Sequence, residues 1–195
     1  MPTIYDQIYA ASEPYWQTRE NHIHIPEVYE FAKQMLALYP EADPEIVLPA
    51  ILMHDNGYKL VPEEIQFQGL ADAPGGWKPE VTRLHEQAGA KLAGEILGAL
   101  NYDPAKTKLI QEIIDGHDSR THAVSLEDSI VKDCDKLWRV TPYGSRMGGR
   151  WTKRSPEEFR NYVESKIETW FLTEHGKRLA REILADTRRQ RIQNG

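Results

Sequence analysis

Cysteine is nearly absent from this sequence. Cys134 is the only cysteine among 195 residues, so an internal disulfide cannot form and a zinc site built from several thiolates is excluded. Any metal ion must therefore be bound by histidine, aspartate or glutamate side chains. Such ligands suit divalent transition metals, namely iron, manganese, nickel, cobalt and zinc.

Long apolar stretches are missing as well. No apolar run approaches the length that crosses a bilayer, and residues 1–8 lack the basic start and apolar core of a secretion signal. The hydrophobic share of 40% and the charged share of 28% are those of an ordinary globular chain. We therefore expect a cytoplasmic protein without a membrane partner.

The chain has no overall excess of positive charge. Its 24 basic and 30 acidic residues give a formal net charge of −6, so no nucleic-acid partner is expected. One segment differs, because residues 136–154 contain six basic and no acidic side chains. This segment is either a solvated basic loop or a binding site for a local anion.

Strand-like alternation is hard to find, whereas helical periodicity recurs throughout. Apolar residues follow helical spacing over 25–39, and the run 46–53 is apolar almost all round, as in a buried helix. The pattern predicts an all-α, single-domain helical bundle of roughly seven to nine helices over residues 1–195. Typical N-terminal caps precede four of these helices, at Asp43, Asp103, Ser125 and Ser155.

Two segments are rich in glycine and proline. Residues 69–79 and 141–149 are both interpreted as loops, and Trp77 and Lys78 in the first loop are predicted to cover a pocket. From Ser155 onward, apolar residues recur at intervals of three and four as far as position 184. This pattern predicts a long helix from Ser155, within a region 140–195 that is expected to form a basic loop and C-terminal helices.

Four of the seven histidines lie about thirty residues apart, near the ends of predicted helices: His24, His54, His85 and His117. One helix out and one helix back would return each histidine to the same end of a bundle, where ligands from facing helices converge. A single histidine of this kind is more often structural. His22, His122 and His175 are interpreted as surface or structural residues, although His22 would share a face with His24 in an extended segment.

Two aspartates accompany these histidines in apolar surroundings. Asp55 follows the apolar run 46–53, and Asp135 shares a helical face with apolar residues. A buried carboxylate is costly unless a cation or hydrogen-bond donors compensate it, so each aspartate is either hydrogen-bonded or a metal ligand. Six candidate ligands exceed the needs of one tetrahedral zinc ion and indicate a dinuclear centre: His24, His54, Asp55, His85, His117 and Asp135.

This ordered set resembles the HD-domain superfamily, which has a histidine, then an adjacent His-Asp pair, then a later aspartate. The segments MHDNG at 53–57 and KDCDKL at 132–137 are similar to the family's second and closing motifs. The segments around His85 and His117 are similar to the extra histidine motifs of members that hold two metals. The resemblance covers residues 21–139.

The resemblance implies an all-helical fold and metal-dependent hydrolysis of a small phosphate ester or phosphoanhydride, a nucleotide among the candidates. One or two divalent cations would activate water. Asp55 would bridge or orient the metals, and Asp118 would support a ligand or accept a proton. Lys59, Arg139 and Arg146 are predicted to contact substrate oxygens, because cationic groups neutralise charge that develops in phosphoryl transfer.

Two alternatives stay open at this point. One branch of the same superfamily uses a mixed-valence pair of irons as an oxygenase, and the six candidate ligands would suit it. The other alternative is a non-catalytic helical module that keeps metal for stability or binds a nucleotide as a sensor. The sequence leaves the substrate, the metal and the oligomeric state open.

Overall fold

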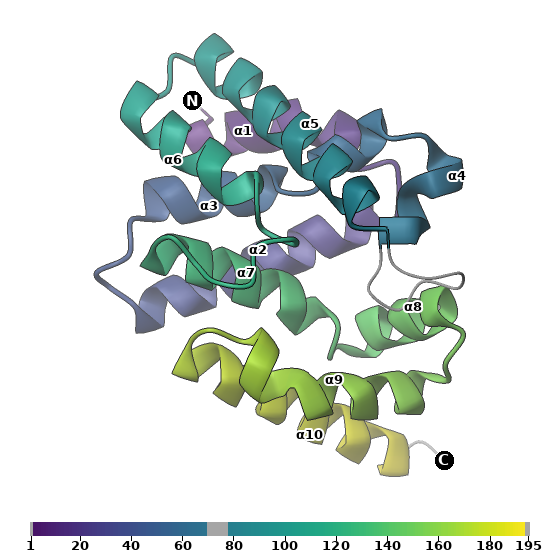
Figure 1. Ribbon diagram of the computed structural model, residues 1–195. Helices are drawn as coiled ribbons and strands as arrows, with labels where there is room; N and C mark the ends of the chain where they lie inside the picture. The colour runs from purple at the N-terminus through teal and green to yellow at the C-terminus, as the bar shows by residue number, and fades with distance from the viewer. Residues whose placement is uncertain (1, 70–77, 194–195) are drawn as a thin grey trace.

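The computed structural model describes residues 2–69 and 78–193, and over these residues it contains ten α-helices, three short 3-10 helices and no strands (Figure 1). The all-α prediction is confirmed, although ten helices exceed the predicted seven to nine. The α-helices are α1 (Ile4–Ser12), α2 (Asn21–Leu38), α3 (Pro44–Met53), α4 (Glu63–Gln66), α5 (Pro79–Ala99), α6 (Pro104–Ile114), α7 (Leu126–Trp138), α8 (Pro142–Thr152), α9 (Pro156–Trp170) and α10 (Glu174–Gln193). The 3-10 helices are η1 (Glu13–Tyr15), η2 (Asn56–Leu60) and η3 (Phe67–Gly69). Of the predicted loop 69–79, residues 70–77, and with them Trp77 of the predicted lid, lie outside the described residues; Lys78 is exposed at the start of α5 and does not line the cavity over the predicted metal ligands.

The four predicted caps are confirmed. The side chain of Asp43 accepts the backbone N–H of residue 45, and Asp103 accepts the N–H groups of residues 105 and 106. Ser125 accepts the N–H of residue 128. Ser155 and Glu158 form a reciprocal capping box. These side chains satisfy N–H groups that the first helical turn leaves without intrahelical partners.

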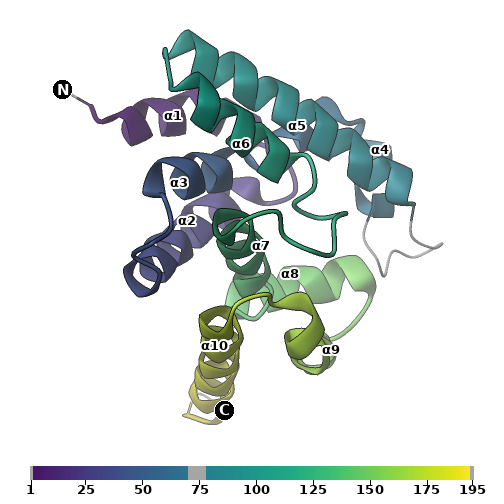
Figure 2. The ribbon, with the colours of Figure 1, turned by 60° about the vertical axis from the view of Figure 1, so that its left-hand side comes forward.

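The apolar helix α3 lies at the centre of the bundle. All of its residues from Ile46 to Met53 are buried, and it packs against α1, α2, α6 and α7. The views in Figures 1 and 2 place α1, α5 and α6 towards one end of the molecule and α9 and α10 towards the other. Residues 54 and 55, which follow the end of α3 directly, therefore lie in the interior of the protein.

The interpretation of residues 141–149 as a loop is wrong, because residues 142–152 form α8. The hydroxyl of Thr141 accepts the N–H of Gly144 at 3.1 Å, and Pro142 occupies the first turn, where its missing N–H costs nothing. A Cβ atom on Gly148 would overlap the ring of Phe159. This glycine allows close packing of α8 on α9 and does not break the helix.

The C-terminal pattern forms two helices, α9 and α10, which pack against each other, and the long helix predicted from Ser155 ends at Trp170. The buried carboxylate of Asp133 on α7 accepts the N–H of Leu172 at 2.8 Å and of Thr173 at 2.9 Å. It also accepts the hydroxyl hydrogen of Thr173 at 2.6 Å. These bonds stabilise the turn at 171–173 that periodicity alone does not show. No helix in the described part of the chain is long and apolar enough to span a membrane.

Candidate metal centre

The six predicted ligands meet in the interior of the bundle, and all six are buried. Two of them follow α3 directly, where the last turn of this buried helix ends. Three come from α2, α5 and α7, and one lies in the turn after α6. They are His24 on α2, His54 and Asp55 after α3, His85 on α5, His117 after α6 and Asp135 on α7.

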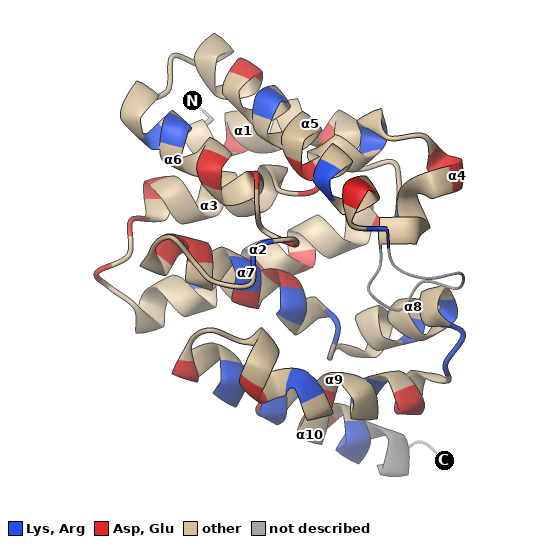
Figure 3. Cartoon of the chain, viewed as in Figure 1, with Lys and Arg blue, Asp and Glu red and all other residues tan. Residues whose placement is uncertain are grey.

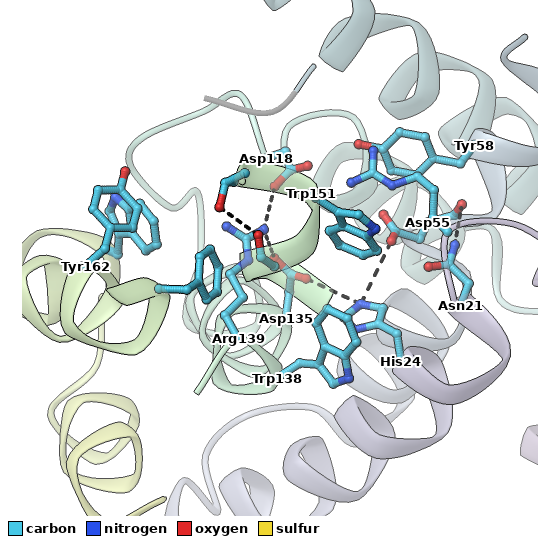
Figure 4. A pocket seen from close by; sticks show the side chains of 15 residues that line it. Asn21, His24, Asp55, Tyr58, Asp118, Asp135, Trp138, Arg139, Trp151 and Tyr162 are labelled. Atoms are coloured by element: carbon cyan, nitrogen blue, oxygen red, sulfur yellow. Dashed lines mark hydrogen bonds and ion pairs between the residues drawn. The ribbon is translucent and has the colours of Figure 1, made fainter. Parts of the chain in front are cut away.

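The first group of ligands surrounds His24 and His54. Their Nε2 atoms are 3.2 Å apart. Asp135 Oδ1 lies 3.4 Å from His24 Nε2 and 3.8 Å from His54 Nε2. Asp55 contributes Oδ2 at 3.9 Å from His24 and Oδ1 at 3.7 Å from His54. Figure 4 shows His24 directed at both carboxylates.

The second group surrounds His85 and His117, whose Nε2 atoms are 3.4 Å apart. Asp55 Oδ1 lies 3.4 Å from His117 Nε2 and 3.9 Å from His85 Nε2. Asp118 Oδ2 lies 3.6 Å from His85 Nε2 and 3.9 Å from His117 Nε2. Asp55 therefore belongs to both groups, as the ligand that a pair of metal ions would share.

The hydrogen bonds of two histidines suit a metal ion. His54 Nδ1 lies 2.8 Å from the carbonyl oxygen of Ile51, and His117 Nδ1 lies 2.9 Å from that of Ile114. A carbonyl only accepts hydrogen bonds, so each Nδ1 carries a proton and each Nε2 faces the centre, where it binds either a second proton or a cation. Lone pairs that face one another at 3.2 and 3.4 Å repel unless a cation or proton lies between them. The residues therefore fit a metal.

Aromatic contacts orient the other two histidines. The ring of His85 stacks on Tyr58 with centroids 3.8 Å apart and an interplanar angle of 11°. The ring of His24 meets Trp138 edge to face at 4.8 Å. Both partners are buried. Ring packing thus restricts these two imidazoles, as the backbone carbonyls restrict His54 and His117.

In the metal-free centre, the buried carboxylates are ionised and need a positive charge to compensate them. Burial alone would raise the pKa of Asp55, but His54, His117 and His24 hold it far below its usual range. Burial would lower the pKa of His117, but the hydrogen bond to Asp55 and the charge of Asp118 raise it to about 9. A proton on His117 therefore compensates these carboxylates, and a divalent cation would take its place.

Arg139 is the one of the three predicted substrate-binding residues that reaches the cavity over the centre. Its guanidinium lies 3.2 Å from Asp135 Oδ2 and 3.6 Å from Asp118 Oδ1. Lys59 on η2 and Arg146 on α8 are exposed and do not line the cavity. Figure 3 shows the basic residues of segment 136–154 spread over the end of α7, α8 and the turn that follows α8. Three of these six basic residues, Arg146, Arg150 and Lys153, are exposed to solvent, whereas about half of the segment is buried in the packing of α7 and α8.

The other three histidines belong to neither group of ligands. His22 and His122 are exposed. His175 is half-buried and packs edge to face on Tyr39 with centroids 5.0 Å apart. The interpretation of these three as surface or structural residues agrees with these positions.

Two buried charges that the sequence did not indicate hold the turn after α6. Glu86 accepts the N–H of Asp118 at 2.9 Å, and the N–H and hydroxyl of Ser119 at 2.7 Å each. Lys132 Nζ donates to the carbonyl oxygens of residues 116, 117 and 120. Both side chains are almost fully buried. They position His117 and Asp118 relative to the centre. Glu86 follows His85 directly, but nothing in its spacing distinguishes it from a solvated helical glutamate.

Arg19 is a second residue that sequence reasoning missed. It lies before α2, has a positive φ of 49° and lines the cavity over the centre. Its guanidinium carbon lies 3.9 Å from the centroid of the Tyr58 ring, and it donates to the carbonyl of Gln66 at 3.1 Å. Among the described residues, no carboxylate lies within ion-pair distance of Arg19. Its charge is therefore available to an anion in the cavity.

The fold and the centre together define a helical protein whose buried histidine and aspartate groups are able to hold one or two metal ions. The family model of the HD domain matches residues 21–139. This range covers 119 of the 195 residues and all six predicted ligands. The chain belongs to the HD-domain family. Neither the curated proteins nor the solved structures contained a significant match.

Proposed function

We propose that the protein is a metal-dependent phosphohydrolase that acts on a small phosphate ester or phosphoanhydride, with nucleotides among the candidates. The observation that carries the proposal is the pair of histidine groups that share Asp55. Divalent cations held by such groups lower the pKa of water and neutralise phosphoryl oxygens. Membership in the HD-domain family supports the same reaction class.

The charges around the cavity favour an anionic substrate once metal is bound. With neutral histidines, three carboxylates and two guanidinium groups give −3 and +2, a sum of −1. The carboxylates are Asp55, Asp118 and Asp135, and the guanidinium groups are those of Arg19 and Arg139. One divalent ion changes the sum to +1 and two change it to +3. Phosphoryl oxygens would therefore enter a positive site.

The two arginines have different roles in this proposal. Arg139 contacts both Asp118 and Asp135, so its charge is largely compensated and it orients these carboxylates. Arg19 has no such partner among the described side chains, so it contacts the phosphate. This assignment replaces Lys59 and Arg146, whose exposed positions lie outside the cavity.

Asp118 is suited to receive a proton from the attacking water. Burial would raise its pKa, but His117 and Arg139 lower it, so the carboxylate is ionised at neutral pH. One oxygen faces His85 and His117, and the other faces Arg139. Because its lowered pKa makes this carboxylate a weak base, it would take the proton from water that bound metal has made more acidic.

The test is phosphate release by protein purified without chelator. Phosphomonoesters, a diester and nucleotides would be incubated with added Mn²⁺, Ni²⁺, Co²⁺, Zn²⁺ or Fe²⁺. We expect release that depends on metal and that Asp55→Asn abolishes, because the amide cannot serve both histidine groups as an anionic ligand. Asp186→Asn, on the exposed face of α10, is the matched control and should retain full activity.

Circular dichroism of both variants separates loss of function from loss of fold. A folded Asp55→Asn protein that still releases phosphate would overturn the proposal. So would a wild-type protein that releases none with any metal. In that case, two bound irons and substrate-dependent oxygen consumption would identify the di-iron oxygenase, and bound metal without turnover would identify the non-catalytic module.

A further inference from the structure

Two series of packed side chains lead away from the metal ligands, one from His85 and one from His24. In the first series, His85 stacks on Tyr58, and the guanidinium of Arg19 lies 3.9 Å from the Tyr58 centroid. In the second series, His24 meets Trp138 at 4.8 Å, and Trp138 meets Trp151 at 5.8 Å. The two series therefore begin at histidines of different ligand groups.

The two series meet above the centre. The guanidinium carbon of Arg19 lies 5.4 Å from the centroid of the Trp151 ring. Figure 4 shows Trp151 between the carboxylates of Asp55 and Asp118 and above Trp138. Trp151 lines the cavity and is half-buried, and its ring also contacts Phe67 with centroids 5.6 Å apart. Arg19 and Trp151 therefore frame the space through which a ligand reaches Asp55.

The remaining wall of the cavity is largely aromatic, and apart from Trp138 it comes from outside residues 21–139. Trp151 on α8 and three residues of α9 line it, and Trp138 completes it from α7. Tyr162 and Trp170 are half-buried, as rings at the rim of a cavity are. The three residues of α9 are Phe159, Tyr162 and Trp170. The family model thus covers the metal ligands, and the C-terminal helices supply an apolar wall beside them.

We infer that the substrate carries a planar aromatic group, which packs on Trp151 while its phosphate contacts Arg19. The inference rests on the proposed function and adds the chemistry of the organic group. The cavity has a volume of about 100 Å³, smaller than the roughly 150 Å³ apolar cavity that accommodates benzene in an engineered protein. A compact ring would therefore lie partly at the rim, where Trp151 is half-buried. The indole of Trp151 gives such a ring a large flat face to pack on, and Arg19 beside it gives the phosphate a cation.

Binding of phosphonates tests the inference without requiring hydrolysis. Phenylphosphonate and methylphosphonate differ only in the ring, and titration calorimetry of the metal-loaded protein would measure both affinities. We expect phenylphosphonate to bind about tenfold more tightly, as a favourable aromatic contact allows. Adenosine 5′-monophosphate is a third ligand, because a nucleobase is the other common source of a planar ring.

Two pairs of variants assign the effect to these residues. Trp151→Leu should reduce the preference for phenylphosphonate to about twofold, and Trp151→Phe should restore most of it, because a ring face is retained. Arg19→Gln should weaken both phosphonates equally, by about tenfold. Arg150→Gln, an exposed arginine next to Trp151, is the control and should change neither affinity.

The outcomes separate this inference from the proposed function. Equal affinity for all three ligands, or an unchanged preference in Trp151→Leu, would overturn it even if phosphate is released from simple esters. A ring preference that depends on Trp151 supports it even if hydrolysis fails. Tighter binding of the adenosine ligand than of phenylphosphonate would assign the ring to a nucleobase, and the reverse would assign it to a single aryl ring.

Discussion

Replacement of Glu86 by glutamine tests whether a buried charge on α5 positions the second group of ligands. Glu86 is fully buried, and its Oε1 atom accepts the N–H groups of Asp118 and Ser119. Its Oε2 atom accepts the Ser119 hydroxyl at 2.7 Å and an N–H of Arg83 at 2.5 Å. Glutamine has nearly the same shape, so it keeps the packing and changes only the charge and the hydrogen-bonding capacity.

The magnitude follows from which bonds survive. The amide oxygen of glutamine still accepts both backbone N–H groups, but its NH₂ group cannot accept from Ser119 or Arg83. A hydrogen bond to a charged group contributes roughly 1.5–3 kcal/mol. Arg83 is 34% exposed and also pairs with Asp115, so its share is small. We expect Glu86→Gln to lower the free energy of unfolding by about 2 kcal/mol.

Metal affinity should fall as well, because the residues that orient ligands typically contribute a factor of about 10 to 100. Urea unfolding would measure stability, and calorimetric titration with Mn²⁺ would measure affinity. Glu95→Gln, on the exposed face of the same helix, should change stability by less than about 0.5 kcal/mol. If Glu86→Gln resembles wild type in both measurements, Glu86 does not position the turn that carries Asp118.

Two further predictions concern packing and pH. Gly57→Ala should prevent stable folding, because the added Cβ would overlap the His85 carbonyl and lie 2.6 Å from Gly89 N. The control is Gly98→Ala, whose Cβ meets nothing within 4 Å, and it should melt like wild type. Equal melting temperatures for both variants would contradict this prediction. The raised pKa of His117, about 9 against an ordinary 6.5, stabilises the metal-free fold fully below pH 6.5, and this stabilisation is lost as pH rises through 9. A metal ion must displace the proton on His117, so the affinity for Mn²⁺ should rise by up to about tenfold per pH unit towards pH 9. An affinity independent of pH between 7 and 9 would show that His117 binds no metal.

The helices with local signals were predictable from the sequence. The caps at Asp43 and Ser155 lie next to the N–H groups that they satisfy, so neighbouring residues alone reveal them. The turn between α9 and α10 depends on Asp133, which lies 39 residues before Leu172. Periodicity does not show such a contact. The reason for Gly148 is also non-local, because its small size matches the ring of Phe159 on the next helix, and composition alone indicated a loop.

The metal centre was more predictable than the cavity above it. Ligands such as His54 must be of a particular type and recur with the helical repeat of a bundle, so residue type and spacing reveal them together. Arg19 has no required spacing. It lies in an irregular segment, and only the fold brings it over Tyr58. Arg139 was predicted to contact substrate oxygens, and its two carboxylate partners could not be seen without the structure.

The metal content of protein purified without chelator tests the central claim most directly. The two groups that share Asp55 predict two divalent transition-metal ions per chain in the wild type. Asp55→Asn should lose metal from both groups while the protein stays folded. Wild-type protein that contains no metal, takes up none on titration and is equally stable with and without chelator would contradict the account.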